Sequence, residues 1–128
     1  MTPTVMIVDD SEMVRRHVAQ TLIPAGFTIV EASDGADALE QLVGAGAFPS
    51  LIILDVNMPN MNGIEFLQTL RAAEKRAARV PVMMLTTEGQ PRLMQEAKAL
   101  GAKGWIVKPF KSEMLVAAVK KLTQAAVA

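Results

Sequence analysis

Cysteine is absent from this sequence, which excludes disulfide bonds and thiolate metal sites. Net charge is absent too: thirteen basic residues balance thirteen acidic ones, so the overall charge gives no reason to expect nucleic acid or an anionic membrane surface as a partner. No run reaches the roughly 20 apolar residues that span a bilayer. The beginning, MTPTVMIVDD, lacks the basic start and long apolar stretch of a signal peptide. We therefore expect a cytoplasmic protein without a membrane segment.

The composition is that of a globular domain, because 51% of the 128 residues are hydrophobic and 20% are charged. A chain of this length buries most of one core and has no room for a second domain. No repeat, linker or low-complexity segment interrupts it. We expect a single domain over residues 1–128 with its core at about 4–123, and an Ala-rich end, QAAVA, that frays.

Five short aliphatic runs alternate with helical patterns along the chain. The runs predict strands at residues 5–8, 29–32, 51–54, 80–85 and 105–107. The first, the third and the later part of the fourth are apolar without a break, as expected for strands that helices cover on both faces. The second carries Thr28 and Glu31, and the fifth is short, so these two suit the edges of the sheet.

Between the strands, apolar residues recur three and four positions apart, which is the period of an amphipathic helix. The stripes lie at residues 14–22, 38–43, 64–70, 93–100 and 114–122. Residues that favour a helix start precede or open four of them, namely Ser11, Ser33 or Asp34, Pro91 and Ser112. This strict alternation predicts an α/β fold with a parallel sheet, right-handed crossovers and helices on both faces.

Polar residues stand at the carboxyl ends of the predicted strands, where the functional site of such a sheet usually lies. They are Asp9 and Asp10 after the first strand, Asp55 after the third, Thr86 and Thr87 after the fourth, and Lys108 after the fifth. Three acids, two hydroxyls and one ammonium therefore converge on one rim from segments distant in sequence. No glycine-rich phosphate loop lies there.

Phosphoryl transfer onto a carboxylate is the chemistry that suits this group of residues. Three clustered carboxylates repel one another, and Mg2+ relieves that repulsion while keeping places for carbonyls, waters and a phosphate oxygen. Asp55, central in the sheet, is the expected nucleophile, since aspartate forms acyl phosphates. Lys108 and Mg2+ would offset charge on the phosphoryl oxygens in the transition state, and Thr86 would donate a hydrogen bond to one of them.

Taken alone, each of these residues has a simpler interpretation. Asp9 and Asp10 would help to cap the first helix, where the dipole favours acids. Thr86 would make a local turn, and Lys108 would be a solvated surface lysine. His17 is a helix residue without a visible partner. Convergence favours the functional interpretation, because unrelated surface residues would not gather at three central strand ends.

The chain resembles the receiver domains of two-component response regulators, and among them the single-domain chemotaxis (CheY-like) type. The resemblance covers residues 5–122 and rests on motifs in a fixed order: Asp9-Asp10, DVNMPNMNG at 55–63, Thr86, and KPF at 108–110. It implies a flavodoxin-like, doubly wound sheet of five parallel strands in the order 2-1-3-4-5; this order comes from the resemblance, since the chemotaxis receiver is itself the standard example of it.

The resemblance also implies the chemistry of the site. Asp55 would accept a phosphoryl group from a sensor histidine kinase or a phosphotransfer protein. Asp10, Asp55 and the backbone carbonyl of Asn57 would bind Mg2+ directly, with Asp9 acting through water, and Lys108 would contact the phosphoryl group. The protein would be a signalling phosphoacceptor that assists its own phosphorylation and dephosphorylation, not an enzyme.

Trp105 stands where the family keeps its switch aromatic, although a lone tryptophan there would indicate packing. On phosphorylation the Thr86 hydroxyl would move inward and the ring would follow, changing the face built from the fourth helix, fifth strand and fifth helix. Trp105 is bulkier than the tyrosine or phenylalanine usual at this place, and Thr87 is larger than its usual counterpart. Asn57 and Glu88 match the chemotaxis type, which implies a short-lived phosphorylated state.

The expected output is contact with a downstream protein, such as a flagellar motor switch component, by a monomer. Two other functions stay open. A phosphatase of the haloacid dehalogenase type also uses a strand-end aspartate, Mg2+ and a lysine, but it needs a second acid two residues later, where Asn57 stands. The other is a receiver-like docking module without phosphotransfer. A flavin site is disfavoured, because Asp9-Asp10 replaces the hydroxyl- and glycine-rich loop that flavin phosphate needs.

Overall fold

Five strands and five helices alternate in the computed structural model, which describes residues 3–44, 48–56, 58, 61–73, 78–86 and 91–127. In chain order the elements are β1 Thr4–Val8, α1 Glu12–Leu22, β2 Thr28–Ala32, α2 Gly35–Gly44, β3 Leu51–Asp55, α3 Gly63–Ala72, β4 Val82–Thr86, α5 Pro91–Ala99, β5 Gly104–Val107 and α6 Ser112–Val127. None of the described helices is both long and apolar enough to cross a membrane.

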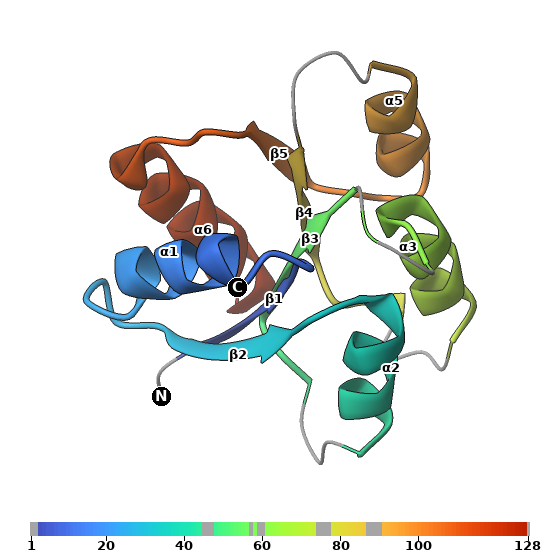
Figure 1. Cartoon of the computed structure of the whole chain (residues 1–128), viewed down its shortest axis with the longest axis horizontal. Helices are drawn as coiled ribbons and strands as arrows, with labels where there is room; N and C mark the ends of the chain where they lie inside the picture. Colours follow the sequence, from blue (N-terminus) through green and yellow to red (C-terminus); the bar gives the residue numbers. More distant parts are fainter. Residues whose placement is uncertain are drawn as a thin grey trace.

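The strands form one parallel sheet in the order β2-β1-β3-β4-β5, with β2 and β5 at its edges. Figure 1 shows the sheet between two layers of helices, with α1 and α6 on one side and α2, α3 and α5 on the other. The doubly wound, flavodoxin-like fold and the two edge strands are therefore confirmed.

Alternating side chains of the central strands divide the core into two clusters, one under each helical layer. Residues such as Val8, Leu54 and Met84 pack toward α2, α3 and α5. Their sequence neighbours, such as Ile7, Ile53 and Leu85, pack toward α1 and α6. Because both faces of β1, β3 and β4 are covered, every residue of these strands after Thr4 is buried, which explains their uninterrupted apolar runs.

The fourth strand begins later than the sequence suggests, at Val82 and not at residue 80. Pro81 has no N–H to donate to a neighbouring strand, so it can join the sheet only as a hydrogen-bond acceptor. Its carbonyl accepts the N–H of Ile52 on β3 at 2.9 Å. Val80 is nevertheless buried in the core cluster. Ser112 is also displaced, since it is the first residue of α6 and not the residue before it.

The helix starts are fixed by short polar side chains. Ser11 accepts the N–H of Val14, and Asp34, one of the two candidates for α2, accepts the N–H of Asp37 at 2.7 Å. At α3, the Asn62 side chain accepts from the backbone of Glu65, whose carboxylate accepts the Asn62 N–H in return.

Arg71, at the end of α3, binds four backbone carbonyls near the amino ends of β4 and β5. Its Nη1 donates to Ala78 and Val80 at 2.8 and 3.0 Å, its Nε to Leu100 at 2.9 Å, and its Nη2 to Gly101 at 3.4 Å. Burial lowers the pKa of the guanidinium. One side chain thus ties the segment before β4 to the segment before β5.

Candidate functional site

Three carboxylates gather where β1 and β3 end. Asp9 and Asp10 follow β1, Asp55 closes β3, and one carboxylate oxygen from each lies within 4.8 Å of the others. Asp9 is fully buried and Asp55 is only 3% exposed, whereas Asp10 is exposed. Buried carboxylates require compensating charge or hydrogen bonds, so the surroundings must supply them.

Lys108 supplies the charge. Its Nζ lies 3.1 Å from Asp9 Oδ2 and 3.2 Å from Asp55 Oδ1, and its side chain is only 21% exposed. Burial alone would lower the pKa of Lys108, but the charges of Asp55 and Asp9 and their hydrogen bonds outweigh burial and hold that pKa above its ordinary value. The interpretation of Lys108 as a solvated surface residue is therefore wrong.

Hydrogen bonds complete the surroundings of Asp9. Its Oδ1 accepts the N–H of Ser11 at 2.9 Å, and its own N–H donates to the carbonyl of Ala32 on β2 at 3.1 Å. The Asp10 carboxylate has no hydrogen-bond or ion-pair partner within the described parts of the chain. Of the two neighbouring acids, Asp10 is thus the one with oxygens free for a ligand.

The glycine at the end of the DVNMPNMNG motif is required by its close approach to the backbone at the end of β3. Gly63 donates its N–H to the carbonyl of Val56 at 2.9 Å. A Cβ at Gly63 would lie 2.5 Å from the carbonyl oxygen of Asp55 and 2.9 Å from Cα of Val56. The absence of a side chain at Gly63 therefore lets the start of α3 lie directly against the end of β3.

Thr86 and Trp105 lie on the neighbouring strands β4 and β5, two residues apart in the sheet register. Thr86 is fully buried at the end of β4, level with Val107, and its carbonyl accepts the N–H of Lys108 at 2.7 Å. Trp105 lies level with Met84 on the edge strand β5 and is 36% exposed. The structure thus brings Thr86 to the acidic rim, and it leaves Trp105 partly open to solvent. Asn57, Thr87 and Glu88 lie outside the described residues.

His17 has a partner that the sequence did not reveal. Its ring stacks on that of Phe110, with centroids 4.6 Å apart and planes 20° from parallel. The interpretation of His17 as an unpartnered helix residue is therefore wrong. The contact joins α1 to the loop after β5, two residues beyond Lys108. Phe110 belongs to the KPF motif, but only the packing of α1 beside α6 shows which side chain it meets.

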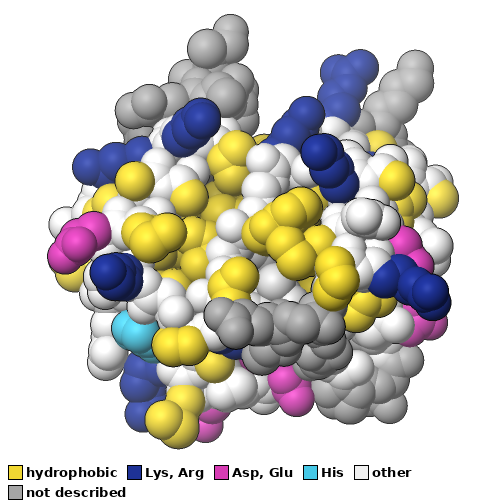
Figure 2. Space-filling model, turned by 90° about the horizontal axis from the view of Figure 1, so that it is seen from above, with side chains coloured by type: hydrophobic (Ala, Val, Ile, Leu, Met, Phe, Trp, Pro, Cys, Tyr) yellow, Lys and Arg dark blue, Asp and Glu magenta, His cyan; other side chains and the backbone are white. Residues whose placement is uncertain are grey.

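Figure 2 looks onto the face formed by α5, β5 and α6. Hydrophobic side chains gather in its middle, and Lys and Arg side chains surround them. Trp105 and Met114 are among the exposed large hydrophobic residues. Residues 91–127 contain seven basic residues and two acidic ones, so the neutral chain concentrates positive charge in this part of its sequence.

Comparison with known proteins identifies the class. The sequence profile described as the response regulator receiver domain matches residues 5–120, and the chain belongs to this family. Receiver domains are signalling phosphoacceptors of two-component systems and not enzymes in their own right, so the phosphatase alternative is disfavoured.

Within the family, the chain is similar to chemotaxis proteins. It is 39% identical over 119 residues to the chemotaxis protein CheY of Pseudomonas aeruginosa, covering 92% of this chain and 94% of that protein. It is 38% identical over 111 residues to CheY1 of Helicobacter pylori, covering 86% and 88%. Among solved structures, the chemotaxis response regulator CheY4 of Vibrio cholerae matches with a TM-score of 0.86 and 41% identity over 95% of this chain and 99% of that one.

The residues present fit the metal that receiver domains bind through an aspartate cluster. Mg2+ prefers oxygen ligands and retains several waters. Asp9, Asp10 and Asp55 offer carboxylate oxygens within reach of one centre, and the exposure of Asp10 leaves room for waters. The donor set contains no nitrogen or sulfur ligand that would favour a softer metal.

Proposed function

We propose that the chain is a chemotaxis-type switch that is phosphorylated on Asp55 by a sensor histidine kinase or a phosphotransfer protein. The phosphoryl group leaves the nitrogen of a phosphohistidine as the P–N bond breaks, and a new P–O bond forms to the Asp55 carboxylate. The observation that carries this proposal is the Lys108 ammonium, which lies 3.1 and 3.2 Å from two buried carboxylates of different strands. A mere helix cap would not require such a cation.

Asp10, Asp55 and the backbone carbonyl of Asn57 hold Mg2+ in this proposal, and Asp9 acts through water. The exposed, unpartnered carboxylate of Asp10 supports its role as a direct ligand. Both oxygens of Asp9 already accept hydrogen bonds, from Ser11 and from Lys108, which supports an indirect role. When bound, the ion supplies positive charge for the phosphoryl oxygens.

Lys108 and the Thr86 hydroxyl contact the phosphoryl group in this proposal. The Lys108 ammonium, which binds the carboxylates of Asp9 and Asp55 before phosphorylation, then also binds the phosphoryl oxygens. Thr86 then moves toward them, Trp105 follows inward, and the face of α5, β5 and α6 changes. Phosphorylation thus shifts a two-state equilibrium without forming a new fold.

The downstream partner we propose is a protein segment that carries acidic and apolar residues, presented by a component of the flagellar motor switch. The chemotaxis names of the similar proteins support this output. The charge of the face supports the chemistry, because a hydrophobic centre with basic residues around it is complementary to such a segment. The switch acts as a monomer in this proposal.

Labelling with a small phosphodonor tests the proposal. Acetyl phosphate and Mg2+ should add one phosphoryl group to the native protein, seen by intact mass, and the group should map to Asp55. Asp55→Asn should abolish labelling. Glu40→Gln, which alters an exposed acid on α2, is the matched control and should label normally. An unlabelled, folded wild-type protein would leave only the docking-module function.

A further inference from the structure

Arg15 makes two contacts that the proposed function does not use. From α1, its Nη1 donates to the backbone carbonyl of Asp9 at 2.6 Å, and its Nε donates to Glu31 Oε1 on β2 at 3.0 Å. The Arg15 side chain is only 15% exposed. A surface arginine serving solubility alone would not be held at both ends of its guanidinium.

The carbonyl that Arg15 binds belongs to the peptide bond between Asp9 and Asp10. On the other side of Asp9, its N–H is bound to Ala32, and its carboxylate is bound to Ser11 and Lys108. Every polar group of Asp9 is therefore fixed. The Asp10 side chain has no such contact of its own within the described chain, and it projects from the residue directly after the carbonyl that Arg15 holds.

We infer that Arg15 is a positioning residue for the metal site: by holding the Asp9–Asp10 peptide, it aims the Asp10 carboxylate at Asp55. Residues that orient metal ligands without touching the metal commonly change metal affinity when they are replaced. The inference rests on the proposed function, because it concerns the same Mg2+ site.

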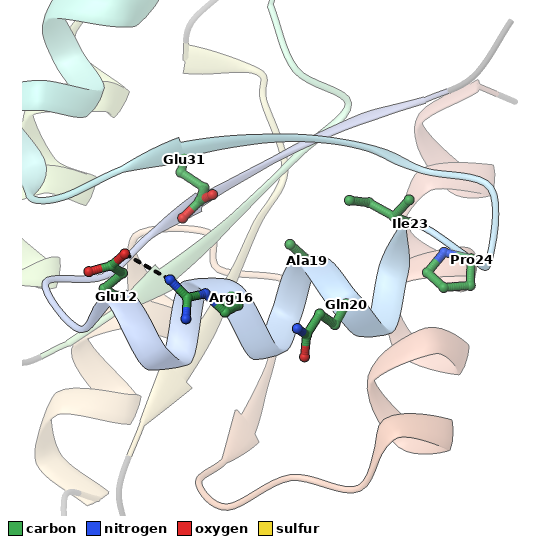
Figure 3. A pocket seen from close by; sticks show the side chains of 7 residues that line it. All are labelled: Glu12, Arg16, Ala19, Gln20, Ile23, Pro24 and Glu31. Atoms are coloured by element: carbon green, nitrogen blue, oxygen red, sulfur yellow. Dashed lines mark hydrogen bonds and ion pairs between the residues drawn. The ribbon is translucent and has the colours of Figure 1, made fainter.

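Glu31 completes the device. It lies level with Ile7 in the sheet register, on the face of the sheet that α1 covers, and Figure 3 shows its carboxylate above α1. A guanidinium beside a cation site would repel Mg2+. The Glu31 carboxylate offsets the charge of Arg15, and it also holds the Nε side of the guanidinium, which Nη1 does not reach. Arg15 can therefore orient Asp10 at little electrostatic cost to the metal.

A matched control lies one residue away. Arg16 pairs with Glu12 at 3.0 Å, but its side chain is 65% exposed, and neither residue forms a hydrogen bond or an ion pair with Asp9. Both Glu12 and Arg16 line a pocket of about 410 Å³ between α1 and β2, with Glu31 on its far wall (Figure 3). The two arginines thus have the same charge, the same helix and a glutamate partner each, and only Arg15 reaches the site.

The test is a Mg2+ titration followed by amide NMR, with thermal unfolding measured in parallel, on the full chain and four variants. Arg15→Met should weaken Mg2+ binding by about tenfold and shift the Asp10 amide resonance before any metal is added. Arg16→Met should change neither. Arg15→Lys should not restore affinity, because a single ammonium cannot reproduce the two separate hydrogen bonds of the guanidinium to Glu31 and to the Asp9 carbonyl. Glu31→Gln should weaken binding, since it frees the Nε side of the guanidinium and leaves Arg15 uncompensated.

Three results would overturn the inference. Tighter Mg2+ binding by Arg15→Met would mean that Arg15 acts only through its charge. Wild-type affinity with a lower melting temperature would mean that it only stabilises the fold. If Arg15→Met does not fold, a Glu31→Gln variant that binds Mg2+ with wild-type affinity would also overturn the inference. Absence of Mg2+ binding by the wild type would be a different failure, that of the proposed function itself.

Discussion

The Lys108 ammonium bridges Asp9 and Asp55, at 3.1 Å from one carboxylate and 3.2 Å from the other. The two acids come from different strands and are both buried, so each depends on the same cation for much of its charge compensation. Lys108 therefore does two things at once. Its positive charge stabilises the two buried carboxylates, and the same charge repels any further cation at the acidic rim.

The first prediction follows from the repulsion between the Lys108 ammonium and a bound Mg2+ ion. Lys108→Met should bind Mg2+ about fivefold more tightly, since a unit charge at contact distance is worth about 1 kcal/mol even in a water-like dielectric. The same variant should be phosphorylated more slowly by acetyl phosphate, because it lacks the cation for the phosphoryl oxygens. Calorimetric titration and the labelling rate measure the two effects. Lys111→Met, at an exposed position three residues later, should change neither. Weaker Mg2+ binding by Lys108→Met would contradict this repulsion.

The second prediction concerns alkaline pH. Because the pKa of Lys108 is raised in the folded state, its contribution to stability is fully present below the unfolded value of about 10.4 and is lost as pH rises through the folded value. The free energy of unfolding in urea should therefore fall more steeply above about pH 10.4 in the wild type than in Lys108→Met.

The sequence makes this measurement simple, because it contains neither tyrosine nor cysteine to titrate in the same range. Lys111→Met removes one lysine outside the acidic rim, and it should keep the wild-type slope. Equal slopes in the wild type and Lys108→Met would show that the ion pairs do not stabilise the fold.

The third prediction concerns Gly63. Gly63→Ala should lower the free energy of unfolding by about 2 to 3 kcal/mol, because its Cβ would press on the backbone of Asp55 and Val56, which cannot rotate away. Labelling of Asp55 should slow as its carboxylate shifts. Gly104→Ala is the control, since nothing lies within 4 Å of its added Cβ. Urea unfolding measures both variants, and similar stabilities would mean that the β3 end adapts to the added methyl group.

The fourth prediction concerns the proposed switch. Trp105 is the only tryptophan, and it is partly exposed, so its fluorescence should change when acetyl phosphate labels the protein. Thr86→Val keeps the shape of the side chain but removes the hydroxyl, and it should be labelled without that change. Thr86→Ser should retain the change. A wild-type spectrum that stays constant during labelling would remove the switch role of Trp105.

The sequence predicted the fold well because its signals were of two robust kinds. Uninterrupted apolar runs marked the strands covered on both faces, and polar residues marked where those strands end. The carboxyl ends of parallel strands share one edge, so Asp9, Asp55 and Lys108 could be placed together without knowing any distance. The strand order itself came from the family resemblance.

Contacts between side chains of different elements were beyond the sequence. The pairs Arg15–Glu31 and His17–Phe110 depend on how α1 lies against β2 and α6, which no local pattern encodes. The capping box at Asn62 was different, because an Asn followed three residues later by Glu65 is a readable helix start.

The four carbonyls gathered by Arg71 belong to the end of the sheet opposite the acidic rim. Arg71 connects the segment before β4 to the segment before β5, so the two strands cannot slide past each other at that end without breaking several hydrogen bonds. Under the proposed function, phosphorylation of Asp55 should therefore change the acidic rim and the face of α5, β5 and α6, while the end of the sheet that Arg71 holds should keep its arrangement.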